Sequence, residues 1–435
     1  WKIYHAYSKS KNYIIIMKHL KKWILDQKKV NKIFIKRKNL DNLENWIISN
    51  KKIYHKTKNF FQIIGIRVFS NFNKKTWDQP IMIQNENGIL GIIRKKFNMN
   101  YKYLLQTKLE PGNINQLQLS PTVQATESNY KRVHGGKKTK FLEYFMKKKF
   151  IVKSKQSEQG LRYLNKFNTN YLVDVKKNLK LPNHFKWFSK SELNYLIKQK
   201  NMINMDTISV FSCLINKGKN EKLINSDKKL KNWINKQNKK YKISHKKIDI
   251  KNIRDWKIKK NIFTNFKKRH FSVIGLSIKS NCREVKKWDQ PIIAGKKLGF
   301  AGFIIKNFNG TTHYLCRYIL KPGLKGGKIS CSTNFSDIKD FKKNLNIPSY
   351  EKKIIKYFFK KKKYLYNNIH SDEGGRFYHT QIKRVIVQAD NKLDKKLNSK
   401  FIWISHNQFI SLIKKRMVDI EARLLFTCFN FDKTL

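Results

Sequence analysis

Residues 110–136 carry side chains that can bind and transform a polar ligand. Their sequence, EPGNINQLQLSPTVQATESNYKRVHGG, is rich in Gln, Asn, Ser and Thr, and its only Lys and Arg residues are Lys131 and Arg132. Neutral amides and hydroxyls donate and accept hydrogen bonds without placing a net charge beside a ligand. Pro111-Gly112 and Gly135-Gly136 are typical turn sequences, so they bracket the stretch. The ordinary alternative is a polar surface loop.

Four side chains in or near this stretch are candidates for acid–base chemistry. Glu158 is a lone acid among neutral residues in QSEQG, and it is our first candidate for a catalytic carboxylate. The matching run in the second half is SDEGG at 371–375, which carries Glu373. Glu110 is the second, because the second half of the chain has Lys321 at the matching place. His134 and Tyr130 can act as an acid or as a donor to an oxyanion. The ordinary alternatives are an ion-paired or helix-capping carboxylate and a solvent-facing ring.

A larger set of side chains suits hydroxyl groups, a nucleobase or a diphosphate. Arg376 follows Gly374-Gly375, a backbone that lets an anion approach closely. Trp77 is suited to stacking on a base, but it recurs in the second half and is equally suited to a core. The predicted binding residues are Trp77, Gln79, Gln106, Lys108, Asn113, Thr122, Gln124, Thr126, Ser128, Asn129, Arg132, Glu373 and Arg376.

The composition limits the class of protein. A chain of 435 residues predicts two domains. The net charge of +68 is typical of a nucleic-acid or membrane binder, but only 13 of the 96 Lys and Arg residues are Arg, the usual phosphate and base reader. The excess of Lys, Ile, Asn, Phe and Tyr also fits A/T-rich codon usage. We therefore expect no specific nucleic acid and no membrane among the partners.

The five cysteines form no CxxC pair, which is typical of reduced thiols in a cytoplasmic protein. No His, Cys or Asp cluster has metal-ligand spacing, and no Gly-rich loop has the spacing of a dinucleotide or phosphate loop. The sequence therefore predicts no metal and no cofactor.

An internal repeat organises the chain. WDQPI recurs at residues 77 and 288, FKWFS at 185 recurs as FIWIS at 401, and NFFQIIGIRV at 59 recurs as RHFSVIGLSI at 269. These offsets lie between 210 and 216 residues, so insertions fall in loops. The predicted domains are a basic lead-in (1–30), a first repeat (31–216), a linker (217–226) and a second repeat (227–435). We expect the chemistry mainly in the first repeat, because the second shows no counterpart of SPTVQATESNYKRVHGG.

Local patterns predict the elements that position these residues. Residues 17–40 and 40–50 are predicted as helices, and 60–68, 81–83, 89–93 and 103–109 as strands. WDQP is expected to interrupt the second strand, and Asn87-Gly88 to form a hairpin turn. Ser189 is predicted to cap a helix, and another helix is expected to begin near Asn204.

Three motifs together closely resemble the NDP-hexose 2,3-dehydratases of deoxysugar biosynthesis: the 110–136 stretch, WDQPI at 77–81 and QSEQG at 156–160. The resemblance covers roughly residues 40–430. It implies an α+β fold of two tandem Nudix-like domains, although no Nudix box is present. It also implies a homodimer, a dTDP-4-keto-6-deoxyhexose substrate and a 3-ketoreductase that acts on the product.

The resemblance implies loss of water across carbons 2 and 3 of the sugar, which needs a base, an acid and donors for an enolate. Two alternatives remain open. The lysine content suits a basic nucleic-acid-binding protein. Ile208, where the family pattern leads us to expect Arg, suits a relative that has lost catalysis.

Overall fold

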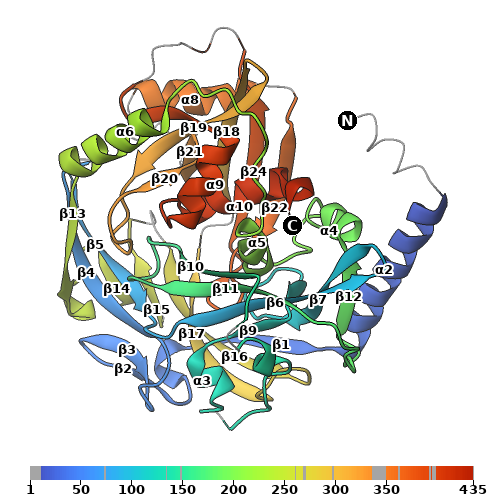
Figure 1. Ribbon diagram of the computed structural model, residues 1–435. Helices are drawn as coiled ribbons and strands as arrows, with labels where there is room; N and C mark the ends of the chain where they lie inside the picture. Colours follow the sequence, from blue (N-terminus) through green and yellow to red (C-terminus); the bar gives the residue numbers. More distant parts are fainter. Residues whose placement is uncertain are drawn as a thin grey trace.

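The computed structural model describes residues 11–72, 75–133, 135–146, 149–259, 261–267, 271–295, 298–335, 349–360, 363–390, 393 and 398–434. The chain is an α+β protein of mixed sheets with helices packed around them. Figure 1 shows the first half of the chain in blue to green in the lower part of the molecule and most of the second half in orange and red above it.

The first half contains α2 (Lys11–Val30), β1 (Ile33–Lys38), β2 (Trp46–Ile48), β3 (Lys52–His55), β4 (Gln62–Ser70), β5 (Lys75–Ile83), β6 (Gly88–Phe97), β7 (Asn100–Leu109), β8 (Leu117–Pro121), β9 (Val123–Ala125), α3 (Glu127–Tyr130), β10 (Val152–Ser157), β11 (Phe167–Asp174), β12 (Phe185–Ser189), α4 (Lys190–Leu196) and α5 (Met205–Ser212). The second half contains α6 (Asp227–Lys240), β13 (Ile243–Ile248), β14 (Trp256–Lys259), β15 (Ile262–Asn265), β16 (Ser272–Ser280), β17 (Lys287–Ala294), β18 (Gly299–Phe308), β19 (Thr311–Ile319), β20 (Lys328–Ser330), β21 (Thr333–Phe335), α8 (Ser349–Lys360), β22 (Tyr366–Ser371), β23 (Phe377–Tyr378), β24 (Gln381–Gln388), β25 (Phe401–Ser405), α9 (His406–Lys414) and α10 (Ile420–Phe429). Single turns of 3-10 helix lie at Leu40–Asn42, Leu142–Tyr144, Ile250–Asn252 and Phe431–Lys433.

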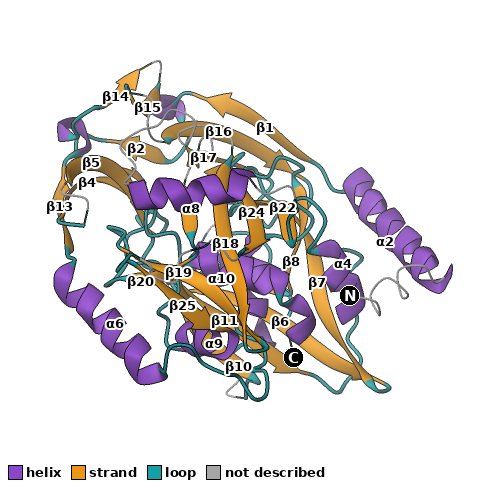
Figure 2. Ribbon diagram, turned by 90° about the horizontal axis from the view of Figure 1, so that it is seen from above, coloured by secondary structure: helices purple, strands orange, loops and turns teal. Residues whose placement is uncertain are grey.

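The two halves repeat one plan. In the first, β6 pairs with β7, β9 and the parallel strand β11, and α5 packs on this sheet; in the second, β18 pairs with β19, β21 and the parallel strand β24 beside α10. The helix α2 precedes β1 as α6 precedes β13, and Trp23 and Trp233 occupy matching turns. Figure 2 shows these two helices at opposite ends of the molecule. The basic lead-in is therefore the counterpart of α6.

Each half gives one strand to the sheet of the other. β1 pairs antiparallel with β16, and β13 pairs antiparallel with β4. In Figure 1 the yellow-green β13 lies beside the blue β4. A Cβ at Gly65 would lie 2.7 Å from the carbonyl oxygen of Ile248, and one at Gly275 would lie 2.4 Å from that of Lys38. Glycine therefore allows the exchanged strands to approach.

A buried tryptophan and a buried aspartate fix each exchange. The indole of Trp46 donates to the carbonyl oxygen of Asp289 at 2.8 Å, and that of Trp256 donates to the carbonyl oxygen of Asp78 at 3.2 Å. The Asp78 carboxylate accepts from Arg67 of its own half and from Arg254 of the other. Both WDQP motifs therefore tie the halves together.

Several local predictions are corrected by the structure. Residues 40–50 form one turn of 3-10 helix and then β2, because Trp46 must reach across to Asp289. β5 runs unbroken through WDQP, since Gln79 and Pro80 pair along β4. Asn87-Gly88 is no hairpin turn, because β6 pairs with other strands. The predicted strands at 60–68 and 103–109 are confirmed as β4 and β7. The predicted helices capped by Ser189 and Asn204 are confirmed as α4 and α5.

The comparison of the two repeats also corrects two sequence-based alignments. β20 and β21 occupy the places of β8 and β9, so SPTVQA does have a counterpart in SCSTNF. The amide of Gly112 donates to Gly374 as that of Gly323 donates to Gly160. This relation matches Glu158 with Asp372 and Gln159 with Glu373, so Glu158 and Glu373 are not equivalent positions.

Among the helices of the described residues, none combines the length and the apolar character that a bilayer crossing requires.

The Asp78 contacts predict a measurable stability difference. Burial raises the pKa of Asp78, but hydrogen bonds from Arg67 and Arg254 outweigh burial and hold the pKa at about 2, below the ordinary 3.8. Ionised Asp78 therefore contributes stability above pH 4 that is lost as the pH falls through about 2. Asp78→Asn should lower the free energy of unfolding at pH 7 by about 2 kcal/mol. Urea titrations of the parent, Asp78→Asn and Asp289→Asn measure the free energy of unfolding. Asp289→Asn should lower it less, because among the described residues Lys38 is the only side-chain cation within 4 Å of Asp289.

Candidate active site

Two neighbouring cavities of about 400 Å³ each lie between the repeats. Arg283 and Glu284 line both of them. The first cavity contains Gln106, Lys108 and Gln124 with several further lysines, and the second contains aromatic rings together with Arg376. Each cavity falls within the size of a small-molecule site, and together they suit an elongated ligand.

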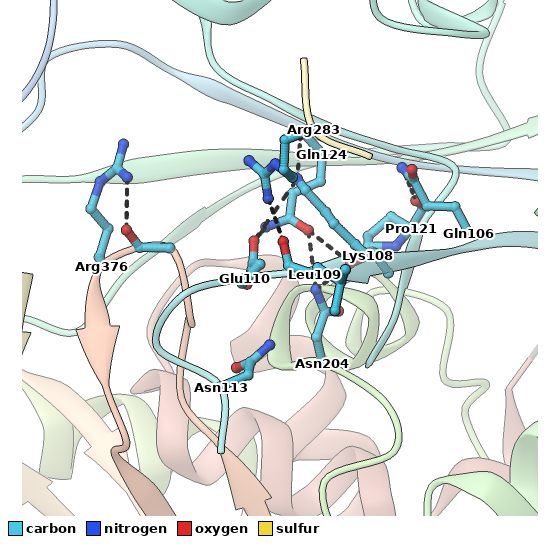
Figure 3. Close-up of polar contacts among 12 residues, drawn as sticks. Gln106, Lys108, Leu109, Glu110, Asn113, Pro121, Gln124, Asn204, Arg283 and Arg376 are labelled. Carbon is cyan, nitrogen blue, oxygen red and sulfur yellow. Dashed lines mark hydrogen bonds and ion pairs between the residues drawn. The ribbon is translucent and has the colours of Figure 1, made fainter. Parts of the chain in front are cut away.

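Glu110 lines neither cavity itself, but it lies next to residues that line each of them. Its Oε1 accepts a hydrogen bond from Gln124 at 3.1 Å and lies 3.9 Å from Nζ of Lys108, both of which line the first cavity. Figure 3 shows Gln124, Lys108 and Arg283 around Glu110. On the other side, a Cβ at Gly375 would lie 3.7 Å from Oε1 of Glu110, and Gly375 lines the second cavity.

The second repeat supplies part of this site. A Cβ at Gly375 would also lie 3.9 Å from Oε1 of Glu373, so Glu110 and Glu373 face the same space from different repeats. Oε2 of Glu373 accepts a hydrogen bond from the hydroxyl of Tyr163 at 2.7 Å. The candidate site therefore includes loops of both repeats, and the placement of the chemistry mainly in the first repeat stays a prediction.

Glu158 lies beside Glu373. The relation between the repeats maps the hydrogen-bonded pair Gln159–Asp372, 2.5 Å apart, onto Glu373–Glu158. Oε1 of Glu158 accepts from Asn168, while Oε2 is buried without a hydrogen-bond partner among the described residues. Burial, and then the charge of Glu373, raise the pKa of Glu158 to about 7. The charge repulsion between these two buried carboxylates favours a state in which they hold one proton between them.

Asp206, at the start of α5, is a site residue that sequence reasoning missed. It is 3% exposed, and burial followed by the charges of Glu373, Glu158 and Glu110 raises its pKa well above the ordinary value. The only sign of Asp206 in the sequence is its place as an acid in the first turn of a predicted helix. Such acids are common because they interact favourably with the helix dipole, so this position alone does not indicate a site residue.

Arg283 was also missed, since the sequence showed it only beside Glu284. Nη1 of Arg283 donates to the carbonyl oxygen of Leu109 at 2.7 Å, and its guanidinium lies 5.8 Å from the ring centroid of Trp288. The sequence separation of 174 residues hides this contact.

The two repeats have the same backbone plan, so the region around Glu110 has an equivalent region elsewhere in the molecule. In that equivalent region the buried charged side chains form ion pairs. Asp372 is bridged by Arg162 at 2.6 Å, and Lys321, the counterpart of Glu110, is bridged to Asp419 at 2.7 Å. Arg384 donates to Glu421 at 3.0 Å. The two regions share one backbone plan, so the carboxylates without such partners mark the region around Glu110 as the candidate site.

Other predicted residues surround this centre. Gln106 donates to the carbonyl oxygens of Pro121 and Thr122, and Asn129 lines the second cavity. The guanidinium of Arg376 lies 4.5 Å from the ring centroid of Phe61 and faces the same cavity. Asn113 is buried beneath Gly374, and its Oδ1 has no hydrogen-bond partner among the described residues.

The remaining predicted residues lie in other surroundings. The hydroxyl of Thr122 contacts the backbone of Ile93 and Leu104, as Ser332 does in the second repeat. Neither cavity is lined by Trp77, Gln79, Thr126, Ser128, Tyr130 or Arg132, nor by the carboxylates Glu110, Glu158 and Glu373.

Trp77, Gln79 and Tyr130 have clear structural contacts. Trp77 donates to Gln79, which donates to the carbonyl oxygen of Leu161, and Trp288 and Gln290 repeat this arrangement. Tyr130 packs on a hydrophobic cluster that includes Val173, and Arg132 is exposed. His134 lies outside the described residues.

No three His, Cys, Asp or Glu side chains within the described part of the chain are arranged to hold a metal ion.

Comparison with known proteins places this arrangement in a class of sugar-nucleotide lyases. The family model for NDP-hexose 2,3-dehydratase matches residues 17–214 and 227–429, so the chain belongs to that family. It is 29% identical to the dTDP-4-dehydro-6-deoxy-alpha-D-glucopyranose 2,3-dehydratase of Amycolatopsis orientalis, over 94% of this chain and 89% of the relative. Enzymes of the same name from Streptomyces violaceoruber and Saccharopolyspora spinosa are 28% and 27% identical, over 93% of this chain and 95% and 89% of theirs.

The raised pKa of Glu158 predicts that this residue lowers stability at alkaline pH. A folded-state value of about 7 against an ordinary 4.5 means that the stability contributed by the protonated form is complete below pH 4.5 and is lost as the pH rises through 7. Glu158→Gln should therefore unfold with a free energy about 2–3 kcal/mol higher than that of the parent at pH 8, and nearly the same at pH 4.5. Denaturant titrations at both pH values measure this, and an equal effect at the two would contradict it.

Proposed function

We propose that this protein removes water across carbons 2 and 3 of dTDP-4-keto-6-deoxyglucose, the substrate type named in its relatives. The observation that carries the proposal is that, among the described residues, the buried carboxylates Glu158 and Asp206 lack the ion pairs that their counterparts Asp372 and Glu421 make in the other repeat. Burying such groups lowers stability, so a role in proton transfer accounts for them better than a structural role.

The chemistry requires what these residues supply. The ketone at C4 acidifies the proton at C3, a base removes that proton, and the enolate expels the C2 hydroxyl as water. A C2=C3 enol remains and tautomerises to the 3,4-diketone. No electrons pass to or from the protein, so the reaction balances without a redox partner.

We assign the base to Glu373, which faces the space beside Gly375 and is more exposed than Glu110 or Glu158. Burial raises the pKa of Glu373, and the charge of Arg376 and the hydroxyl of Tyr163 oppose this shift. Glu158 lies behind Glu373 as its proton-sharing neighbour. Glu110 faces Glu373 across the same space and is suited to accept a hydrogen bond from a sugar hydroxyl.

The cations and rings suit the nucleotide. Lys108, Arg283 and Arg376 border the junction of the cavities and suit a diphosphate. Phe61 and Trp288 in the second cavity suit a base that stacks. Gln106 and Gln124 offer neutral hydrogen-bonding groups in the first cavity.

Three further assignments accompany this function by family resemblance. They are a homodimer, a 3-ketoreductase that consumes the unstable product, and a cytoplasmic location. A Nudix-like ancestry of each repeat is consistent with a mixed sheet that combines a parallel pair, β6–β11 or β18–β24, with a packed helix.

The test is direct turnover. The purified protein is incubated with dTDP-4-keto-6-deoxyglucose, a 3-ketoreductase and NADPH, and the dTDP-2,6-dideoxyhexose product is measured by chromatography and mass spectrometry. The expected result is product at a rate that depends on protein concentration. If none forms while the Amycolatopsis orientalis enzyme is active in the same mixture, the proposal fails.

The space beside Gly375 gives a second prediction. Gly375→Ala should fold normally, because the nearest atoms to its Cβ are 3.7 and 3.9 Å away, yet its methyl group enters the substrate space between two carboxylates. We expect kcat/KM to fall about 10-fold or more, since small misplacements are costly in catalysis.

Gly374→Ala is the matched control. Its Cβ would lie 2.4 Å from Oδ1 of buried Asn113, so it should lower the melting temperature. Thermal unfolding and steady-state kinetics of both variants separate the two effects. Unchanged kinetics in Gly375→Ala would place the substrate elsewhere.

A further inference from the structure

In the second repeat, buried Glu421 is paired with Arg384. At the matching positions of the first repeat the carboxylate is kept, but the arginine is replaced by a neutral residue. Strand register matches Asn170 with Arg384, and the helix caps Asn204 and Asp419 match Asp206 with Glu421. Asn170 contacts Ser209 and the backbone of Ser154, so it leaves Asp206 alone. Among the described residues no hydrogen bond or ion pair to the Asp206 carboxylate is present.

The start of α5 is held against the candidate site. Asn204 donates to Oε1 of Gln124 at 3.0 Å, and Gln124 in turn donates to Glu110. On its other side, Met205 accepts a contact from Gln159 at 3.2 Å. Asp206 follows directly, so it lies between the strand that carries Gln124 and the loop that carries Glu158.

The charged groups that act on Asp206 come from three separate parts of the chain. Lys108 lies on β7 and Glu110 directly follows it. Glu158 follows β10, and Glu373 belongs to the loop before β23. Three of these four are acidic, and Lys108 is the one cation among them. A carboxyl group in such surroundings keeps its proton, because ionisation would add a further negative charge to a buried cluster.

Resting on the function proposed above, we infer that Asp206 is the proton donor to the departing C2 hydroxyl. Glu373 takes the proton from C3, and the electron pair of that C–H bond forms the enolate. The enolate then re-forms the ketone as the C2–O bond breaks, and the Asp206 proton joins the leaving hydroxyl to give water. Glu373 ends protonated and Asp206 ionised, and transfer of one proton through the cluster or from water restores the starting state.

This division of labour separates two observable steps. Removal of the C3 proton needs Glu373 alone, whereas loss of water needs Asp206 as well. Asp206→Asn should therefore exchange the C3 hydrogen of dTDP-4-keto-6-deoxyglucose with D2O at a rate within about 3-fold of the parent's turnover. Its elimination rate should fall about 10²–10⁴-fold, the usual contribution of general acid catalysis.

The experiment follows exchange by NMR and elimination by the trapped product in the same sample. Both rates come from the same folded molecules, so their ratio is independent of the folded fraction. Glu373→Gln should lose both steps. If Asp206→Asn eliminates at the parent's rate, or loses exchange as fully as elimination, the inference is overturned.

Glu421→Gln is the control at the equivalent position. It leaves buried Arg384 without its carboxylate, so it should lower the melting temperature without changing the ratio of exchange to elimination. The same assay on the parent protein distinguishes a failure of the proposed function from a failure of this inference. If the parent itself does not eliminate water, the proposed function fails; if it does and the Asp206 ratio is normal, only this inference fails.

Discussion

The exchange of one strand between the repeats is the constraint on which the rest of the structure depends. β1 and β13 each complete the sheet of the other half, and each WDQP aspartate accepts hydrogen bonds from residues that follow the exchanged strand. Neither half can therefore close its own sheet. The repeats also meet at their loops: Gly112 after β7 is bonded to Gly374 after β22, and Gly323 after β19 is bonded to Gly160 after β10.

This symmetric frame creates two equivalent boundaries, and the chain has specialised only one. On one side the buried charges are matched, as in Arg162–Asp372 and Lys321–Asp419. On the other, Glu110 stands in the place of Lys321, and Asp206 has lost the arginine available to Glu421. Since the backbone plan is shared, a difference in folding requirement does not explain this contrast. Selection for chemistry at one boundary does.

The sequence predicted the class of fold and the repeat, because these depend on local patterns and near-identical motifs, while its site residues stay predictions. Gln106 and Lys108 lie on β7, Glu110 directly follows it and Gln124 lies on β9 of the same sheet, so residues close in sequence lie close in space. The helix caps were predictable for the same reason: Ser189 and Asn204 contact backbone only three residues away.

What the sequence missed depends on contacts between residues far apart in the chain. Arg283 reaches Leu109 across 174 residues, and Gln159 contacts Asp372 across 213. Comparison of the two motifs also assigned the wrong equivalent position to Glu158. QSEQG and SDEGG can be aligned by their glutamates, but the backbone of the two repeats matches Gly160 with Gly374. The strand exchange was invisible in principle, since β13 has the same alternating pattern whether it pairs with β4 or with β16.

The candidate site is a cluster of the buried carboxylates Glu110, Glu158, Asp206 and Glu373. Burial and repulsion within this cluster raise the pKa of Glu158, Asp206 and Glu373. The nearby cations are already engaged: Arg423 donates to Ser209 and Ser212, and Lys108 to Gln124. They temper the repulsion without forming the short ion pairs that would fix every carboxylate in the ionised state. Buried carboxyl groups that keep a proton near neutral pH are what a general acid requires, and the strand exchange supplies the stability that such groups remove.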